Sequence, residues 1–139
     1  IEFCDSLLPK DRPRYLMGVG RPTDIVKAIR RGVDMFDCVM PTRNARNAQL
    51  FTNMGKINIR NSKYKNDHSP IDSNSESILP QNYSKAYLHH LFKVNEILGL
   101  RIATQNNLSF YINLMKNMRK KIIEGSFDEW STNFINNYI

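Results

Sequence analysis

The stretch RYLMGVGRPTDIVKAIRRGVDMFDCVMP, which runs from Arg14 to Pro41, decides the fold of this chain. It opens with an apolar run, Arg14–Val19, that predicts a buried strand. Apolar residues at helical spacing follow within Thr23–Arg31, and Gly32 is a stop signal for that helix. A second apolar run, Val33–Met40, predicts another strand. Strand, helix and strand in this order predict a βαβ unit with parallel strands and a right-handed crossover.

Beyond this unit the sequence predicts a hairpin and a polar loop. Gln49–Thr52 and Lys56–Arg60 are the expected strands, and Asn53–Gly55 is the expected three-residue turn with Gly55 in the left-handed conformation. The segment 61–82 is rich in Ser and Asn, which predicts an irregular or mobile loop.

Three amphipathic helices are predicted for the rest of the chain. Ser84–Leu98 and Leu108–Glu124 each place their apolar residues on one face, and Gly125 ends the second of these helices. Ser126 and Glu129 have the spacing of a capping box, which predicts that the last helix begins there.

One βαβ unit does not make a complete fold. Parallel strands are usually buried on both faces and need neighbours, and the sequence contains no further βαβ pattern. The absence of an initiator methionine fits a natural start upstream of Ile1, although removal of N-terminal residues by processing also explains it. We therefore expect the C-terminal part of a larger α/β protein.

The composition is that of a soluble globular protein, with 41% hydrophobic and 24% charged residues among 139. No apolar run approaches the roughly eighteen residues of a membrane span, and the first residues lack the pattern of a secretory signal. Two cysteines, Cys4 and Cys38, do not make a disulfide framework. These features predict a cytoplasmic protein.

The net charge of +7 is confined to one half of the chain. Residues 1–65 hold 13 basic and 6 acidic residues, which leaves +7, whereas residues 66–139 hold 7 of each. A local surplus of this kind favours a polyanionic partner such as a nucleic acid. A basic surface with no such partner fits the charge equally well.

The candidate site follows from Asp37, a lone carboxylate within the second apolar run. An unpaired carboxylate in such a run is costly to bury, which favours either a functional group or a structural aspartate bonded to backbone amides. Pro41 ends the second apolar run, and the loop expected after it, Pro41–Asn47, sets Arg43 and Arg46 three residues apart. Guanidinium groups bind phosphates and base edges, although a solvated basic turn has the same spacing.

Five strings of this sequence resemble the C-terminal part of the bacterial tRNA-guanine transglycosylases, or queuine tRNA-ribosyltransferases. They are RYLMGVG (14–20), RRGVDMFDCVMPTRNARN (30–47), KINIRNSKYK (56–65), NYSKAYLHHL (82–91) and NEILG (95–99). The resemblance runs from about Pro9 to the end of the chain. It implies the C-terminal portion of a modified (β/α)8 TIM-like barrel with a hairpin insertion, a zinc subdomain and C-terminal helices. The implied divisions are residues 1–60, 61–106 and 107–139.

The family exchanges guanine for a 7-deazaguanine, of the preQ1 or queuine type, at the wobble position of certain tRNAs. Asp37 matches the nucleophile that forms a covalent ribosyl-aspartate intermediate. Met17 and Gly18 match residues that line the base pocket. The positions that match RNA-contacting segments are Gly18, Val19, Gly20, Arg21, Pro22, Thr23, Asp24, Thr42, Arg43, Asn44, Ala45 and Arg46.

The zinc site of the family is expected to be lost. Its CxCxxC pattern aligns with Ser75, Ser77 and Pro80, and its histidine aligns with Asn106. None of these side chains binds zinc as a thiolate or an imidazole does. No cofactor is therefore expected, and the surrounding loop is expected to be mobile.

The resemblance also implies partners. The other base-reading residues of the family lie in earlier barrel strands, so we expect this chain to be inactive unless an N-terminal chain supplies them. A homodimer is expected through Tyr83, Tyr87 and His90. The alternative is a non-catalytic remnant that binds RNA or a partner subunit.

Overall fold

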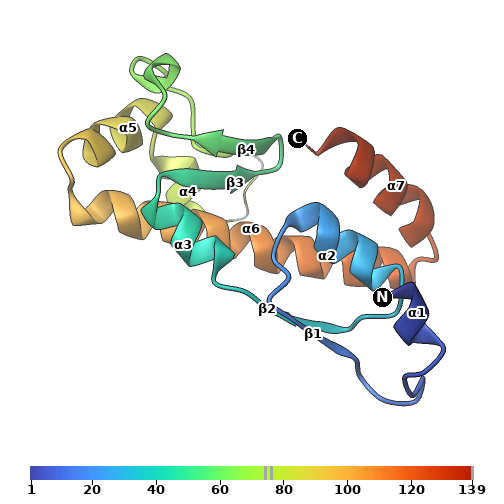
Figure 1. Ribbon diagram of the computed structural model, residues 1–139. Coiled ribbons are helices and arrows are strands. Elements are labelled where there is room, and N and C mark those ends of the chain that lie inside the picture. The colour runs from blue at the N-terminus through green and yellow to red at the C-terminus, as the bar shows by residue number, and fades with distance from the viewer. Residues whose placement is uncertain (74, 76, 139) are drawn as a thin grey trace. The chain divides into compact units, whose positions relative to one another are not determined.

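The structure is a computed structural model that describes residues 1–73, 75 and 77–138 and consists of two compact units (Figure 1). The first unit comprises residues 1–40 and 114–138, and the second comprises residues 41–113. No described helix is long and apolar enough to cross a membrane.

The first unit contains the predicted βαβ motif. Strands β1 (Tyr15–Met17) and β2 (Met35–Asp37) pair in parallel, with Tyr15 opposite Met35 and Met17 opposite Asp37. Helix α2 (Pro22–Ile29) connects them. Outside the ladder, the Asp34 carboxylate accepts a 2.8 Å hydrogen bond from the backbone N–H of Arg14. This bond fixes the register where the two strands begin.

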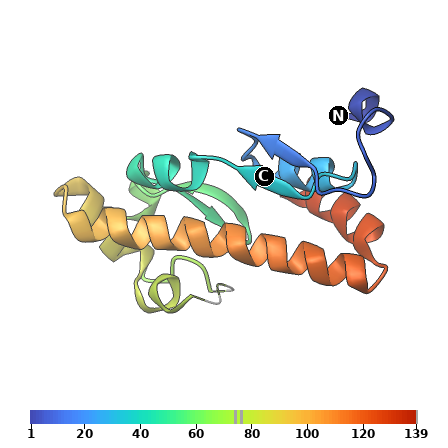
Figure 2. The same cartoon turned by 90° about the horizontal axis from the view of Figure 1, so that it is seen from below.

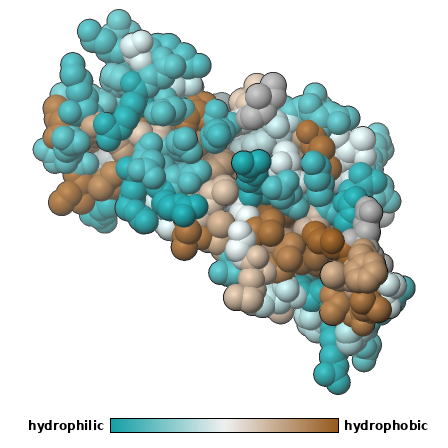
Figure 3. Space-filling view, in the orientation of Figure 1, coloured by the Kyte–Doolittle hydropathy of each residue, from teal (hydrophilic) through white to brown (hydrophobic). Residues whose placement is uncertain are grey.

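The prediction that these strands are buried is wrong. The exposed fractions of Tyr15, Met17 and Met35 are 52%, 72% and 48%. In the space-filling view, hydrophobic side chains gather on the first unit, on the side where β1 and β2 run (Figure 3). Within the described residues this sheet has two strands, so no further strand pairs with β1 or β2.

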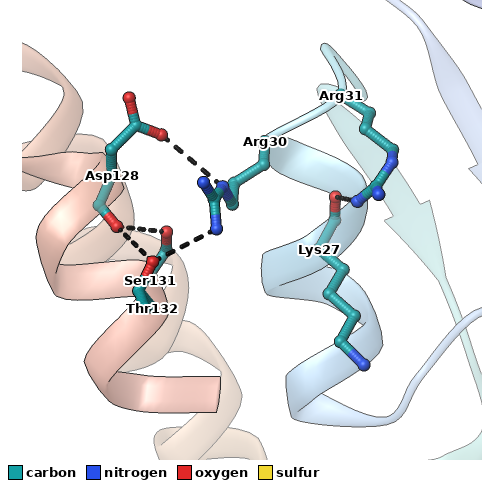
Figure 4. A network of polar contacts seen from close by, with 6 residues as sticks. All are labelled: Lys27, Arg30, Arg31, Asp128, Ser131 and Thr132. Atoms are coloured by element: carbon teal, nitrogen blue, oxygen red, sulfur yellow. Dashed lines mark hydrogen bonds and ion pairs between the residues drawn. The ribbon is translucent and has the colours of Figure 1, made fainter. Parts of the chain in front are cut away.

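Helix α7 (Phe127–Asn137) packs on α2, and α1 (Glu2–Asp5) is a single turn near the N-terminus. Arg30, just past the end of α2, lies 3.5 Å from the Asp128 carboxylate and donates to the Thr132 hydroxyl at 3.3 Å (Figure 4). The predicted capping box is wrong, although α7 does begin after Ser126. The φ and ψ of Ser126, −106° and 13°, are not those of an extended cap residue, and its side chain makes no capping bond.

The second unit begins within α3 (Met40–Arg46), where the sequence predicted a loop. The prediction took Pro41 as a strand terminator, but proline is also favoured in the first turn of a helix. The hairpin follows as β3 (Gln49–Thr52) and β4 (Gly55–Asn58). Thr52 pairs with Gly55, so the turn has two residues instead of the predicted three. Gly55 belongs to the strand, with a φ of 115°.

The two helices predicted at Ser84–Leu98 and Leu108–Glu124 have different boundaries. Helix α5 (Lys85–Lys93) ends early, and α6 (Ile97–Ile123) is one unbroken helix (Figure 2). Asn95 separates them with a φ of 57°, a left-handed conformation that asparagine tolerates. The expected boundary between residues 106 and 107 therefore falls inside α6.

The expected irregular segment 61–82 contains two short helices, η1 (Ser62–Tyr64) and α4 (Ile78–Asn82). Asn74 and Glu76 of this segment lie outside the described residues. The second unit has its own apolar core, to which the hairpin, the segment 61–82, α3, α5 and α6 all contribute. Its buried residues are Ala45, Ala48, Leu50, Ile59, Tyr64, Ile71, Leu88, Leu91, Phe92, Ile102 and Ala103.

Two buried asparagines of α6 bind the free edge of β3. Asn107 Oδ1 accepts from the Phe51 N–H, and its Nδ2 donates to the carbonyls of Gln49 and Pro41, each at 2.9 Å. Asn106 Nδ2 donates to the Phe51 carbonyl at 2.9 Å. These amides satisfy backbone groups that an edge strand otherwise leaves unpaired.

Candidate active site

Asp37 is the last residue of β2, and its carboxylate is exposed at the strand end. Because Met17 pairs with Asp37, the next residue of the first strand, Gly18, comes within reach of it. The Gly18 N–H donates to Asp37 Oδ1 at 3.2 Å and to the Asp37 carbonyl at 3.1 Å. The Tyr15 hydroxyl also bonds to the Asp37 side chain. Two residues of the neighbouring strand segment thus orient this carboxylate.

These hydrogen bonds keep Asp37 charged. The bond from Tyr15, and after it the bond from the Gly18 N–H, hold the pKa of Asp37 below its ordinary value. The hydrogen bond between the Tyr15 hydroxyl and the Asp37 side chain also raises the pKa of Tyr15. An ionised, oriented and exposed carboxylate can act as a nucleophile or as a base.

The turn after β1 is tightly packed against the strand that carries Asp37. A Cβ atom on Gly20 would lie 2.2 Å from the Cys38 Sγ, so no larger residue fits there without movement. The Cys38 Sγ also accepts a hydrogen bond from the Met40 N–H at 3.2 Å. Cys38 therefore fills the space behind the turn.

The segment Gly18–Asp24 offers some of its side chains to solvent. Arg21 and Asp24 are exposed, Val19 and Thr23 are half-buried, and Gly20 and Pro22 are buried. Gly18 has a φ of 74°, which favours glycine. Arg21 precedes α2 as its N-cap, and Pro22 occupies the first turn.

The segment Thr42–Arg46 lies on α3, in the second unit. Arg43 and Arg46 are exposed, and Ala45 is fully buried in the core. Asn44 Nδ2 donates to Gln49 Oε1 at 3.1 Å, which ties α3 to the start of the hairpin. The helical spacing brings the two arginines to neighbouring positions on the solvent side.

A groove of about 720 Å³ runs beside α3 in the same unit. Thr42 and Arg46 form part of its wall, and α6 contributes the rest. The lining residues on the α6 side are Leu98, Leu100, Arg101, Thr104, Gln105 and Leu108.

The predicted site residues fall in both units. Asp37, Met17, Gly18 and the residues up to Asp24 belong to the first unit, whereas Thr42–Arg46 belong to the second. Sequence reasoning missed Tyr15 as a partner of Asp37. The parallel register could have revealed this contact. Met17 pairs with Asp37, and Tyr15 lies two residues before Met17 on the adjacent strand.

The residues at the expected zinc positions do not fit the metal. Ser75, Pro80 and Asn106 are buried, and Ser77 is half-buried. Within the part of the chain that the structure describes, no three His, Cys, Asp or Glu side chains cluster in a way that could hold a metal ion. His89 is engaged elsewhere, since its Nδ1 lies 2.8 Å from the Ile59 carbonyl.

Comparison with known proteins identifies the family. The family model described as queuine tRNA-ribosyltransferase matches residues 1–139. The chain belongs to this family. It is 59% identical over 131 residues to a queuine tRNA-ribosyltransferase of Francisella tularensis subsp. novicida, strain U112. It is 58% identical to the protein with the same name in F. tularensis subsp. tularensis, strain WY96-3418.

The match corresponds to the C-terminal part of the family enzyme. It covers 94% of this chain and 36% of each of these two relatives.

Proposed function

We propose that this chain provides the nucleophile and part of the RNA-binding surface of a tRNA-guanine transglycosylase. The observation that carries the proposal is the ionised Asp37 carboxylate, exposed at the end of β2 and oriented by Gly18 and Tyr15. Membership of the family supplies the reaction class. The proposed substrate is a tRNA, and the proposed location is the cytoplasm.

Asp37 attacks the anomeric carbon of the wobble ribose. The glycosidic bond to guanine breaks, guanine leaves with its bonding electron pair and takes up a proton, and a ribosyl-aspartate ester remains. A 7-deazaguanine base then attacks the same carbon through a ring nitrogen, which loses its proton as the new glycosidic bond forms, and the ester bond breaks to release the carboxylate. The Gly18 N–H and the Tyr15 hydroxyl keep the carboxylate ionised and correctly oriented before attack.

Each unit contributes its own RNA-binding segment. In the second unit, Arg43 and Arg46 on α3 are suited to the phosphates or base edges of the anticodon loop. In the first unit, Arg21 offers an exposed guanidinium. Met17, 72% exposed, and the Gly18 backbone form one wall of the base pocket. Gly20, Pro22 and Ala45 shape these segments from the buried side.

Exchange requires further barrel strands. The exposed apolar side chains of β1 and β2 support this, because parallel strands of a barrel are covered on both faces. An N-terminal part of the enzyme would cover them and would add the remaining base-reading groups. Residues 1–139 alone are then inactive.

The test is incorporation of labelled guanine into tRNA, with and without an N-terminal partner chain. We expect exchange only with the partner, and none with the Asp37→Ala variant under the same conditions. Exchange by the Asp37→Ala variant would rule out the nucleophile. Full exchange by residues 1–139 alone would rule out the need for a partner.

A second candidate function is a non-catalytic remnant that binds RNA or a partner subunit. Tyr83 and Tyr87 stack with their ring centroids 5.6 Å apart, Tyr87 is 40% exposed, and His90 is exposed. This cluster is suited to a homodimer interface. Salt-dependent tRNA binding without exchange, even with the partner present, would favour this function over catalysis.

A further inference from the structure

The segment 70–82 of the second unit carries three of the four positions at which the family resemblance places zinc ligands. Structural zinc takes four sulfur or nitrogen donors from cysteine and histidine. At these positions Ser75 and Ser77 offer hydroxyl groups and Asn106 offers an amide. Pro80 offers no side-chain ligand. The donor set does not fit zinc, so another interaction has to hold this segment against the rest of its unit.

Asn106 already has a structural partner. Its side chain is 2% exposed, and its Nδ2 donates to the Phe51 carbonyl of β3 at 2.9 Å and to Asn107 Oδ1 at 3.2 Å. Both bonds are buried, and a buried amide that loses its partners costs free energy. The residue at the position expected for a metal-binding histidine, Asn106, thus binds the edge of the hairpin instead.

Ser75 and Pro80 make hydrogen bonds within the segment. The Ser75 N–H donates to the Asp72 carbonyl at 3.2 Å, and the Ser75 carbonyl accepts from the Gln81 side chain. The Pro80 carbonyl accepts from the Ile71 N–H at 3.0 Å. Ser75 is 8% exposed and Pro80 is fully buried. These bonds join the beginning of the segment, Ile71 and Asp72, to Ser75, and join both parts to Pro80 and Gln81 near its end.

Asp72 links the closed segment to the hairpin turn. Its side chain is 6% exposed, and Asp72 Oδ2 accepts from the Asn53 N–H at 3.0 Å and from Asn53 Nδ2 at 3.2 Å. Asn53 lies in the turn between β3 and β4. A buried carboxylate is tolerated when hydrogen bonds replace its hydration, and such charge-assisted bonds are stronger than neutral ones.

We propose that this unit folds without zinc, and that buried hydrogen bonds replace a metal site as the link between the segment 70–82, the hairpin and α6. Asp72 holds the segment to the hairpin turn, and Asn106 holds α6 to the hairpin edge. The proposal concerns folding only, so it does not depend on RNA binding or base exchange.

The experiment uses the full chain, purified with and without a strong chelator such as EDTA. Thermal unfolding is followed by circular dichroism, and bound metal is measured by elemental analysis. The variants are Asp72→Ala, which leaves the Asn53 donors unpaired, and Asp11→Ala, which removes an exposed carboxylate of the first unit as a matched control.

We expect no stoichiometric metal and the same Tm with and without chelator. Asp72→Ala lowers the Tm by roughly 5 °C or more, and Asp11→Ala leaves it within about 1 °C. Stoichiometric zinc, a Tm that falls with chelator, or cooperative unfolding only after zinc is added would each overturn the proposal. An unchanged Tm for Asp72→Ala would overturn the part assigned to Asp72. Neither readout depends on catalysis, so these outcomes are separate from those of the exchange assay.

Discussion

Tyr15, Gly18 and Asp37 show how a parallel strand pair orients a carboxylate at its end. The pairing of β1 with β2 brings the Tyr15 hydroxyl and the Gly18 N–H to the Asp37 side chain. Neither donor belongs to β2, the strand that carries Asp37. The carboxylate therefore depends on the register of the two strands.

Replacing Tyr15 by Phe removes the largest cause of the low pKa of Asp37. We expect the pKa of Asp37 to rise toward its ordinary value, so that the carboxylate protonates at a higher pH as the solution is acidified. Carbon-13 NMR titration of the Asp37 carboxyl measures this. Asp67 is the internal control, because Ser69 and Lys85 hold its pKa down independently and its titration should stay the same. An unchanged Asp37 titration would remove Tyr15 from the site.

Gly20→Ala tests the packing behind the turn. The new methyl group would lie 2.2 Å from the Cys38 Sγ, so we expect a loss of about 1–3 kcal/mol in the free energy of unfolding. Urea denaturation measures it. The double variant Gly20→Ala and Cys38→Gly removes this close contact. Its loss in the free energy of unfolding should therefore be smaller than the sum of the losses of the two single variants. Additive losses would mean that the two residues do not interact.

At the scale of elements, α3 and α6 define what the second unit offers. Helix α3 turns the predicted arginine loop into a rigid surface with Arg43 and Arg46 exposed. Helix α6 supports the hairpin through two amides that an amphipathic pattern does not predict at buried positions.

Asn107→Ala leaves the Phe51 N–H and the carbonyls of Gln49 and Pro41 without their side-chain partner. Each unsatisfied buried group costs about 1–3 kcal/mol, so a total loss of about 2–4 kcal/mol is expected after partial relaxation. Asn117→Ala, an exposed position of the same helix, should change the stability by less than about 0.5 kcal/mol. Chemical denaturation of both variants gives the comparison, and equal effects would contradict the assigned role.

Arg43→Ala combined with Arg46→Ala tests the RNA surface. If both guanidinium groups contact phosphates of a single-stranded loop, the slope of log K against log salt concentration should fall by about 1.4, roughly 0.7 for each contact. Binding of an anticodon stem-loop RNA at several salt concentrations measures it. Lys116→Ala combined with Lys120→Ala removes two exposed charges from α6 and is the control. A double arginine variant with an unchanged slope would exclude these phosphate contacts.

At the scale of the whole molecule, the sheet of the first unit is open. In the described part of the chain β1 and β2 have no further partners, and their outer side chains include two exposed methionines, Met17 and Met35. We expect hydrogen peroxide to oxidise both in the chain alone. An N-terminal partner that completes the barrel should protect them, and Met54, 85% exposed in the hairpin turn, should stay reactive. Mass spectrometry of the peptides reports each site, and equal oxidation with and without an active partner would contradict the proposed covering.

Sequence patterns predicted the βαβ unit because its signals are local: two apolar runs, a helical period and the stop at Gly32. They failed where distant contacts decide the structure. The turn at Asn95 and the buried position of Asn107 depend on how α5 and α6 pack on the hairpin. The position of Asp37 at a strand end was predictable, whereas its bond to Tyr15 depends on the strand register.

Among the described residues, the β1–β2 sheet leaves its outer edges unpaired, and this bears on how residues 1–139 behave when they are produced alone. An uncovered strand edge with apolar neighbours is a template for pairing with other chains of the same kind. Residues 1–139 produced alone are therefore exposed to aggregation. More soluble material should form when they are produced together with a chain that covers these strands, and adding that chain to protein that has already aggregated should recover less of it.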